Sequence, residues 1–142
     1  MRRGLLLALS LSVAPLMAPA QSYTDVQWQL LAIDGTRTDA RATLRIDAEN
    51  VLAGAAPCNR WTAGNGAELP ALALGAIRST RMACERLAEE QAFFDALSRM
   101  TAVAQEGERN LILTGPDGRT MEFVPDGADP AVETCTTCLP KD

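Results

Sequence analysis

Residues 86–100 read RLAEEQAFFDALSRM, and their apolar side chains recur at the spacing of an amphipathic helix. The acidic residues gather toward the start of this segment and an arginine stands near its end, which is the distribution that the helix dipole favours. A stripe of Phe, Leu and Met is typical of core packing, so we predict one helix that packs on a hydrophobic core. The residues of this stripe are Leu87, Phe93, Phe94, Leu97 and Met100.

Before this segment the sequence follows the period of two that is typical of β-strands. Thr43–Asp47 alternates cleanly, so we expect Leu44 and Ile46 to face the core while the polar residues between them face water. In residues 68–80, Pro70 limits a strand to an edge or a strand start, and we expect two short strands there or a strand and a bend. The other strands expected before the helix are 27–33, 50–54 and 59–64.

After the helix, residues 110–114 and 119–124 flank a Pro-Asp-Gly turn and predict a β-hairpin. Strands that pack on one side of a single amphipathic helix make an α+β domain. We therefore predict an α+β fold in which a curved antiparallel sheet of about six to eight short strands packs on one helix.

The first twenty residues have the features of a secretory signal peptide. Two arginines precede a short apolar run at 5–13, and Ala18 and Ala20 place small residues where a signal peptidase cleaves. The alternative is a membrane-anchoring helix, but Pro15 and Pro19 interrupt the apolar stretch before it reaches the roughly 20 residues that span a bilayer. We favour cleavage after Ala20 and a periplasmic location without a stable membrane span.

Cleavage would change the charge and define three segments. It removes two arginines and no acidic residue, so the formal net charge falls from −5 to −7. An acidic chain with scattered arginines repels phosphate backbones, which argues against nucleic-acid binding. The segments are the signal peptide 1–20, a domain 21–125, and a tail 126–142 that we expect to be loosely ordered except where its cysteines hold it.

The chain contains no histidine, which excludes nucleophile systems and metal sites that need imidazole. Paired carboxylates are the remaining acid/base candidates, either Glu89 with Glu90 or Asp117 with Glu122. Such pairs act in catalysis only when they are buried and close together. We interpret these four residues as surface charge and assign no catalytic, cofactor-binding or metal-binding residue.

The four cysteines form two unlike pairs. In an exported chain they indicate disulfides, and three full connectivities exist. Pairing Cys58 with Cys84 closes a long loop, which would contribute roughly 3 to 4 kcal/mol, against about 2 kcal/mol for the short ring of Cys135 and Cys138. We take Cys58–Cys84 as the structural bridge.

Cys135 and Cys138 form a C-x-x-C for which three interpretations remain open. The first is a structural disulfide, either between the two cysteines or from the tail to the rest of the protein. The second is a redox-active dithiol, and the third is half of a metal site. We favour the disulfide, because the motif lies near the end of the chain and lacks the helix N-terminus that activates a thiol. A zinc site would need Cys58 and Cys84 or carboxylates as its other ligands.

Two segments around the first cysteine pair resemble a known family. Cys58-Asn59-Arg60 is followed by Ser79-Thr80-Arg81-Met82-Ala83-Cys84 and then by the helix. This arrangement resembles the META-domain family of HslJ-like heat-shock proteins, over about residues 27–124. Pro57 departs from the family pattern, in which a small Gly-like residue precedes the cysteine, and the C-x-x-C tail lies outside it.

The resemblance implies a curved antiparallel sheet on a helix, export, and a role in envelope stress and resistance to some antibiotics. It implies no reaction, since the family is not known for catalysis. We interpret the motif residues Asn59, Arg60, Thr80 and Met82 as structural, with Asn59 in a turn or bonded to buried backbone and with Thr80 and Met82 in the core.

Three functional hypotheses follow from these observations. The first is a monomeric, non-catalytic periplasmic protein without a cofactor, which binds an unknown envelope protein or a small apolar ligand. The second is a small thiol-active protein that uses the tail C-x-x-C. The third is a module that binds lipid or peptide on the concave face of its sheet, by analogy with secretin pilotins.

Overall fold

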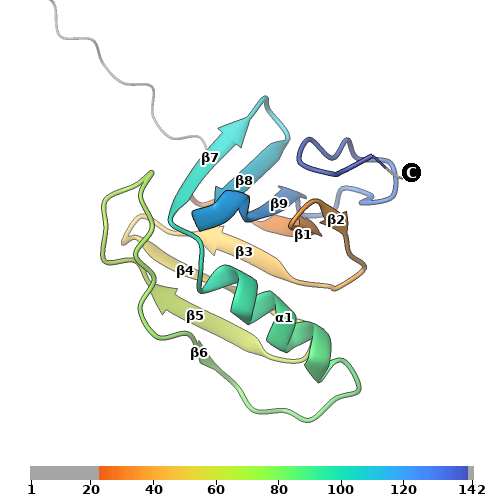
Figure 1. The fold of residues 1–142 in the computed structure, drawn as a ribbon. Coiled ribbons are helices and arrows are strands. Elements are labelled where there is room, and N and C mark those ends of the chain that lie inside the picture. Colours follow the sequence, from red (N-terminus) through yellow and green to blue (C-terminus); the bar gives the residue numbers. More distant parts are fainter. Residues whose placement is uncertain (1–22, 141–142) are drawn as a thin grey trace, which may run out of the picture.

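The computed structural model describes residues 23–140, which form a strongly curved antiparallel sheet with one α-helix on its inner side (Figure 1). The order of the strands across the sheet is β6-β5-β4-β3-β1-β9-β8-β7, and β2 pairs with the end of β1. The strands are β1 (Trp28–Ile33), β2 (Thr36–Arg37), β3 (Thr43–Ile46), β4 (Val51–Ala55), β5 (Arg60–Gly64), β6 (Arg78–Ser79), β7 (Ala102–Glu106), β8 (Asn110–Thr114) and β9 (Thr120–Pro125). The helix is α1 (Leu87–Leu97), and a short 3₁₀ turn η1 (Pro116–Gly118) joins β8 to β9.

The α+β class is confirmed, but the described part of the chain contains nine strands rather than six to eight. One additional strand is β2, which returns after a tight turn in which Asp34 and Gly35 have φ angles of 47° and 73°. The other is β7, which forms an edge of the sheet beside β8. β2 is only two residues long and β7 alternates weakly, so neither strand shows a clear period of two in the sequence.

The strands in the middle of the sheet follow the predicted alternation. Leu44 and Ile46 of β3 are fully buried and Arg45 between them is exposed. β1 is central and pairs with β3 on one side and β9 on the other, with a bulge between Leu30 and Ala32. These strands bury most of the core between the sheet and α1.

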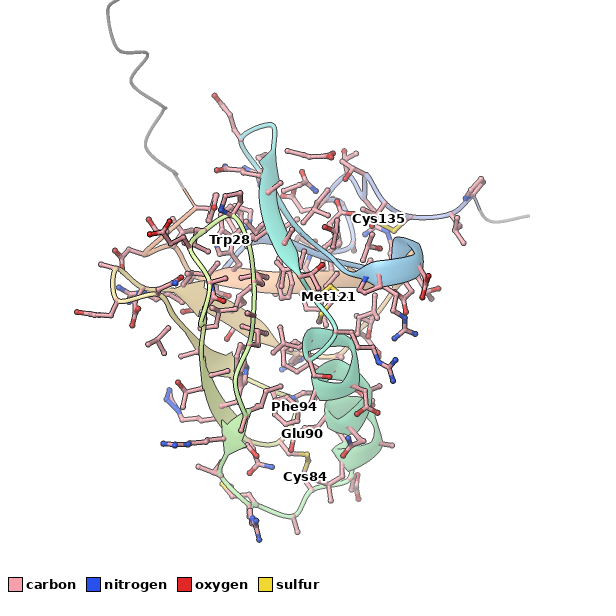
Figure 2. All side chains as sticks on the ribbon, turned by 60° about the vertical axis from the view of Figure 1, so that its left-hand side comes forward. Trp28, Cys84, Glu90, Phe94, Met121 and Cys135 are labelled. Atoms are coloured by element: carbon pink, nitrogen blue, oxygen red, sulfur yellow. A yellow bond between two sulfur atoms is a disulfide. The ribbon has the colours of Figure 1, made fainter. Side chains whose placement is uncertain are left out.

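The helix forms where it was predicted, and it packs most of the predicted stripe on the core. Phe93, Leu97 and Met100 are buried and Phe94 is half-buried, whereas Leu87 is 47% exposed. Glu90 is buried too, and it lies with Phe94 on the side of the helix that faces the sheet (Figure 2). The burial of this acidic residue was not predicted, and its carboxylate finds hydrogen-bond donors on the sheet side.

In residues 68–80, for which two short strands or a strand and a bend were predicted, the structure has one short strand, β6, after an irregular loop with isolated bridges at Ala71 and Leu74. The Asn65 side chain replaces part of a strand ladder, since its Oδ1 accepts a hydrogen bond from Ala73 N at 2.7 Å and its Nδ2 donates to Ala71 O at 3.0 Å. The loop then reaches the opposite edge of the sheet, where Val103 N of β7 donates to Pro70 O at 2.9 Å. The segment therefore bridges the two edges of the curved sheet.

Residues 126–140 lie against the domain as turns and loops. They run beside β2 and β9 (Figure 1) and form backbone contacts as far as Leu139, whose N–H donates to Gly35 O at 3.1 Å. That the tail is loosely ordered away from its cysteines stays a prediction. The signal peptide predicted at 1–20 lies outside the described residues.

Candidate functional site

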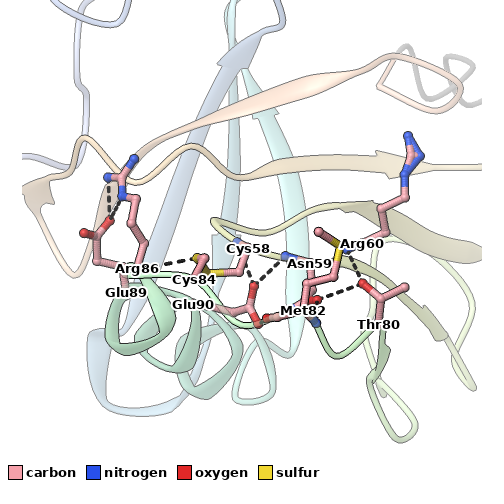
Figure 3. The surroundings of a disulfide bond; sticks show 9 residues. All are labelled: Cys58, Asn59, Arg60, Thr80, Met82, Cys84, Arg86, Glu89 and Glu90. Carbon is pink, nitrogen blue, oxygen red and sulfur yellow. Dashed lines mark hydrogen bonds and ion pairs between the residues drawn. A yellow bond between two sulfur atoms is a disulfide. The ribbon is translucent and has the colours of Figure 1, made fainter.

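The first cysteine pair lies beside a buried carboxylate at the start of α1. Cys58 and Cys84 form a disulfide. Glu90 Oε2 accepts hydrogen bonds from the backbone N–H groups of Cys58 at 2.9 Å and Asn59 at 2.8 Å, and its Oε1 accepts one from Asn59 Nδ2 at 2.7 Å (Figure 3). Glu90 is only 6% exposed, and these donors satisfy its charge away from water.

Asn59 joins the two cysteine segments. Its Oδ1 accepts hydrogen bonds from Met82 N at 2.6 Å and from the Thr80 hydroxyl at 2.9 Å, and Thr80 Oγ1 in turn accepts one from Arg60 N at 3.1 Å. Asn59 is 5% exposed. Of the two roles predicted for this residue, the structure shows the bonding of buried backbone.

The structure corrects the prediction for two other motif residues. Met82 is 65% exposed and Thr80 is also exposed, so neither side chain enters the core. What the motif contributes at these positions is the backbone N–H of Met82 and the hydroxyl of Thr80, both of which bond Asn59. The guanidinium of Arg60 points away from the cluster (Figure 3).

The second cysteine pair also surrounds a buried carboxylate. Cys135 and Cys138 form a disulfide ring of four residues. Glu122 of β9 has no exposed surface, and its two oxygens accept five hydrogen bonds. The donors are Asn110 Nδ2 at 2.6 Å, Thr136 N at 2.8 Å, Thr136 Oγ1 at 3.0 Å, Thr137 N at 2.8 Å and Thr137 Oγ1 at 2.6 Å.

These surroundings set the charge state of Glu122. Burial alone would raise the pKa of its carboxyl group, but the hydrogen bonds from Thr136 and Thr137 outweigh burial and lower it below the usual value. Glu122 is therefore ionised at neutral pH. The interpretation of Glu90 and Glu122 as surface charge is wrong, because each is enclosed by donors that the sequence does not place beside it.

Neither of the proposed carboxylate pairs meets as a pair of buried acids. Glu89 accepts a hydrogen bond from the guanidinium of Arg86 at 2.9 Å, and Asp117 is exposed in the turn after β8.

Among residues 23–140, no group of three or more His, Cys, Asp or Glu side chains is arranged to hold a metal ion. In the same part of the chain, no helix has the length and apolar character that crossing a bilayer requires.

The comparison with known families agrees with this geometry. The family model of the META domain matches residues 21–128, which include the Asn59 cluster, the helix and every strand of the sheet. The chain belongs to the META-domain family. The predicted family is thus confirmed.

Solved structures share the META-domain fold at low identity. An NMR structure of a protein from Burkholderia xenovorans is 20% identical, with a TM-score of 0.57 over 85% of this chain and 100% of that one. A second NMR structure is 16% identical, with a TM-score of 0.52 over 70% of this chain and 88% of the other. No protein of curated function is significantly similar to the chain.

The META match ends at residue 128, so the Cys135–Cys138 ring lies beyond it. Residues 126–131 nevertheless form one wall of a hollow on the META domain, with a volume of about 980 Å³. The connection between β2 and β3 also lines the hollow, and buried Leu30, Leu31 and Ala42 belong to the lining. Charged side chains of both signs surround it: Arg37, Asp39, Arg41, Asp126 and Asp129.

Proposed function

We propose that this META-domain protein is exported and acts in envelope stress or antibiotic tolerance by binding a partner, without catalysing a reaction. Membership of the family supports the stress role, and the two disulfides support an oxidising compartment such as the periplasm.

The use of the buried polar groups favours binding over catalysis. A catalytic acid or base needs a proton to exchange with a substrate and a pKa near the working pH. The Glu90 oxygens accept bonds from Cys58 and Asn59, and those of Glu122 from the C-terminal ring. Both carboxylates are therefore committed to holding the fold together.

The hollow beside β1 is the observation that carries the binding proposal. Its volume lies at the upper end of the roughly 300–1,000 Å³ that is usual for ligand sites. Its lining combines apolar residues with a rim of both charges, which suits a short peptide segment of an envelope protein or a small apolar ligand.

Site-specific photo-crosslinking in the native host tests the binding proposal. A photoreactive residue in place of Arg41, on the rim of the hollow, is expected to give one defined adduct, whose mass identifies a protein or a small molecule. The matched control replaces Arg99, which does not line the hollow. Equal labelling at both positions, or none at Arg41, would contradict binding at this hollow.

Export and stress are tested separately. The intact mass of the protein from an osmotic-shock fraction should correspond to a chain that starts at Gln21. A deletion strain should lose tolerance to heat or to envelope-active antibiotics, and the full chain should restore it, whereas a chain without residues 1–20 should not. Equal restoration by both chains would contradict an envelope role.

The thiol-active alternative is less well supported. Cys135 Sγ lies 3.3 Å from the ionised Glu122 carboxylate, and a negative charge at that distance opposes formation of a thiolate. A catalytic thiol, which must attack its substrate as a thiolate, requires the opposite environment. Rapid exchange of this disulfide with glutathione at neutral pH would restore the alternative.

A further inference from the structure

The sheet has a second buried face beneath the C-terminal segment. Along β8 and β9, Leu111 and Phe123 point into the main core, so Ile112 and Val124 point to the opposite face. Ile112 is only 5% exposed and Val124 is fully buried, although neither belongs to the main core. Glu122 pairs with Ile112 across the two strands and lies on the same outer face, where the C-terminal segment covers it.

Polar contacts hold the segment to this face at several points along its length. Asn110 Nδ2 donates to Thr134 O at 2.9 Å, and Arg37 donates to the carbonyl oxygens of Pro130 and Glu133. The guanidinium of the exposed Arg109 pairs with the Glu133 carboxylate, whose side chain is mostly buried. The Glu122 contacts differ from these, because they alone involve a fully buried charge.

The disulfide gives the ring the shape that Glu122 requires. Within Cys135–Cys138, two consecutive N–H groups and two hydroxyl groups converge on one carboxylate. An open chain would have to be ordered into this arrangement each time it docked. Closing so short a ring lowers the entropy of the detached segment, which favours the docked state by a factor of roughly twenty in the equilibrium constant for docking.

From this geometry we propose that the Cys135–Cys138 ring is a redox-controlled latch, which holds the C-terminal segment on the outer face through Glu122 and releases it when a dithiol reduces the ring. The proposal goes beyond the binding function and does not depend on it. If the hollow binds a partner, release would also open the wall formed by residues 126–131.

The redox step needs only a dithiol as its co-reactant. One thiolate of the dithiol attacks a sulfur of the ring and forms a mixed disulfide, while the other ring sulfur leaves and takes up a proton. The second thiol of the reductant then displaces the remaining cysteine. Two electrons pass to the protein, Cys135 and Cys138 become thiols, and the reductant leaves as its disulfide.

Hydrogen exchange of the full mature chain, followed by mass spectrometry, tests the latch. In C135A/C138A, which retains the Cys58–Cys84 bridge, the amides of Thr136 and Thr137 should exchange at least tenfold faster than in the oxidised wild type. Wild type treated with a dithiol should reach the same rates once mass spectrometry shows the C-terminal ring open and Cys58–Cys84 intact. Unchanged exchange with the ring open would overturn the proposal.

Glu122→Gln is the complementary variant, because it weakens the acceptor and keeps the disulfide. It should show fast exchange at Thr136 and Thr137 even when oxidised. Reduction of the ring in E122Q should raise these exchange rates by less than a further factor of three. If reduction accelerates exchange equally in E122Q and in wild type, the ring does not act through Glu122 and the proposal fails. If C135A/C138A does not fold, the dithiol series on wild type decides by the same criterion.

Discussion

At the scale of single residues, the two buried glutamates play parallel roles. Glu90 binds two consecutive N–H groups next to Cys58, and Glu122 binds two consecutive N–H groups inside the Cys135–Cys138 ring. In both cases a buried carboxyl group accepts hydrogen bonds from irregular backbone that has no partner in a strand or helix. The disulfide beside each carboxylate limits how far the bound segment can move.

Glu122 makes the stability of the protein depend on pH. Its folded pKa lies below the unfolded value of 4.5, so its ionised form stabilises the fold above about pH 4.5, and this contribution is lost as the pH falls through the folded pKa. E122Q should weaken the docking of the C-terminal segment by about 2 kcal/mol at pH 7 and should approach wild type at low pH. Hydrogen exchange of the Thr136 and Thr137 amides, relative to their intrinsic rates at each pH, measures this, with Asp117→Asn as a control at an exposed acid. A constant difference between E122Q and wild type across the series would contradict the assignment.

Asn59 is the residue whose loss should most disturb the first cluster. Asn59→Ala removes the partner of Met82 N and leaves one Glu90 oxygen without its side-chain donor. We expect a loss of about 2 to 3 kcal/mol in the free energy of unfolding, measured by chemical denaturation. Arg60→Ala is the matched neighbour, and its guanidinium points away from the cluster, so it should change stability by less than about 0.5 kcal/mol. Equal losses in both variants would contradict a special role for Asn59.

The sequence identifies these carboxylates poorly for a physical reason. A glutamate on the outer side of a strand or near the start of a helix is normally solvated, and its donors here come from segments far away in the chain. For Glu122 the missing information is the path of the tail, which periodicity does not specify. The Asn59 motif was found because its residues stand beside the cysteines in the sequence.

At the scale of elements, strands with a regular period of two were predictable and irregular segments were not. β3 alternates between buried and exposed residues, so its inward face follows from the sequence alone. The stretch before β6 lacks such a period, because the Asn65 side chain bonds its backbone in place of a neighbouring strand. The helix boundaries were predicted to within a few residues, and the buried face differs from the predicted stripe in the exposure of Leu87 and the burial of Glu90.

The unequal burial of Phe93 and Leu87 gives a direct test of the orientation of the helix. Phe93 is fully buried and contacts Trp61, with ring centroids 5.7 Å apart, so Phe93→Ala should cost about 3 to 5 kcal/mol. Leu87→Ala should cost less than about 1 kcal/mol, because Leu87 is 47% exposed. Thermal and urea unfolding of the two variants compare them. A larger loss for Leu87→Ala than for Phe93→Ala would contradict this orientation of the helix.

At the scale of the whole molecule, the chain consists of a META domain and a C-terminal segment that extends it. The family match contains the sheet, the helix and the Cys58–Cys84 bridge, and it stops before the second disulfide. The segment binds back onto β8 and β9 through Glu122 and Asn110. The two disulfides therefore stabilise different units, one within the domain and one at its surface.

This division predicts different effects for the two disulfides on global unfolding. The Cys58–Cys84 bridge closes a loop that contains the β5 and β6 strands, so C58A/C84A should lower the free energy of unfolding by roughly 3 kcal/mol. C135A/C138A should lower it by less than about 1 kcal/mol, because a segment that detaches locally before the domain unfolds does not contribute its full stability to the global transition. Urea unfolding followed by tryptophan fluorescence measures both, since Trp28 and Trp61 report on the core. A loss of 3 kcal/mol in both variants would mean that the C-terminal segment and the META domain unfold as a single unit.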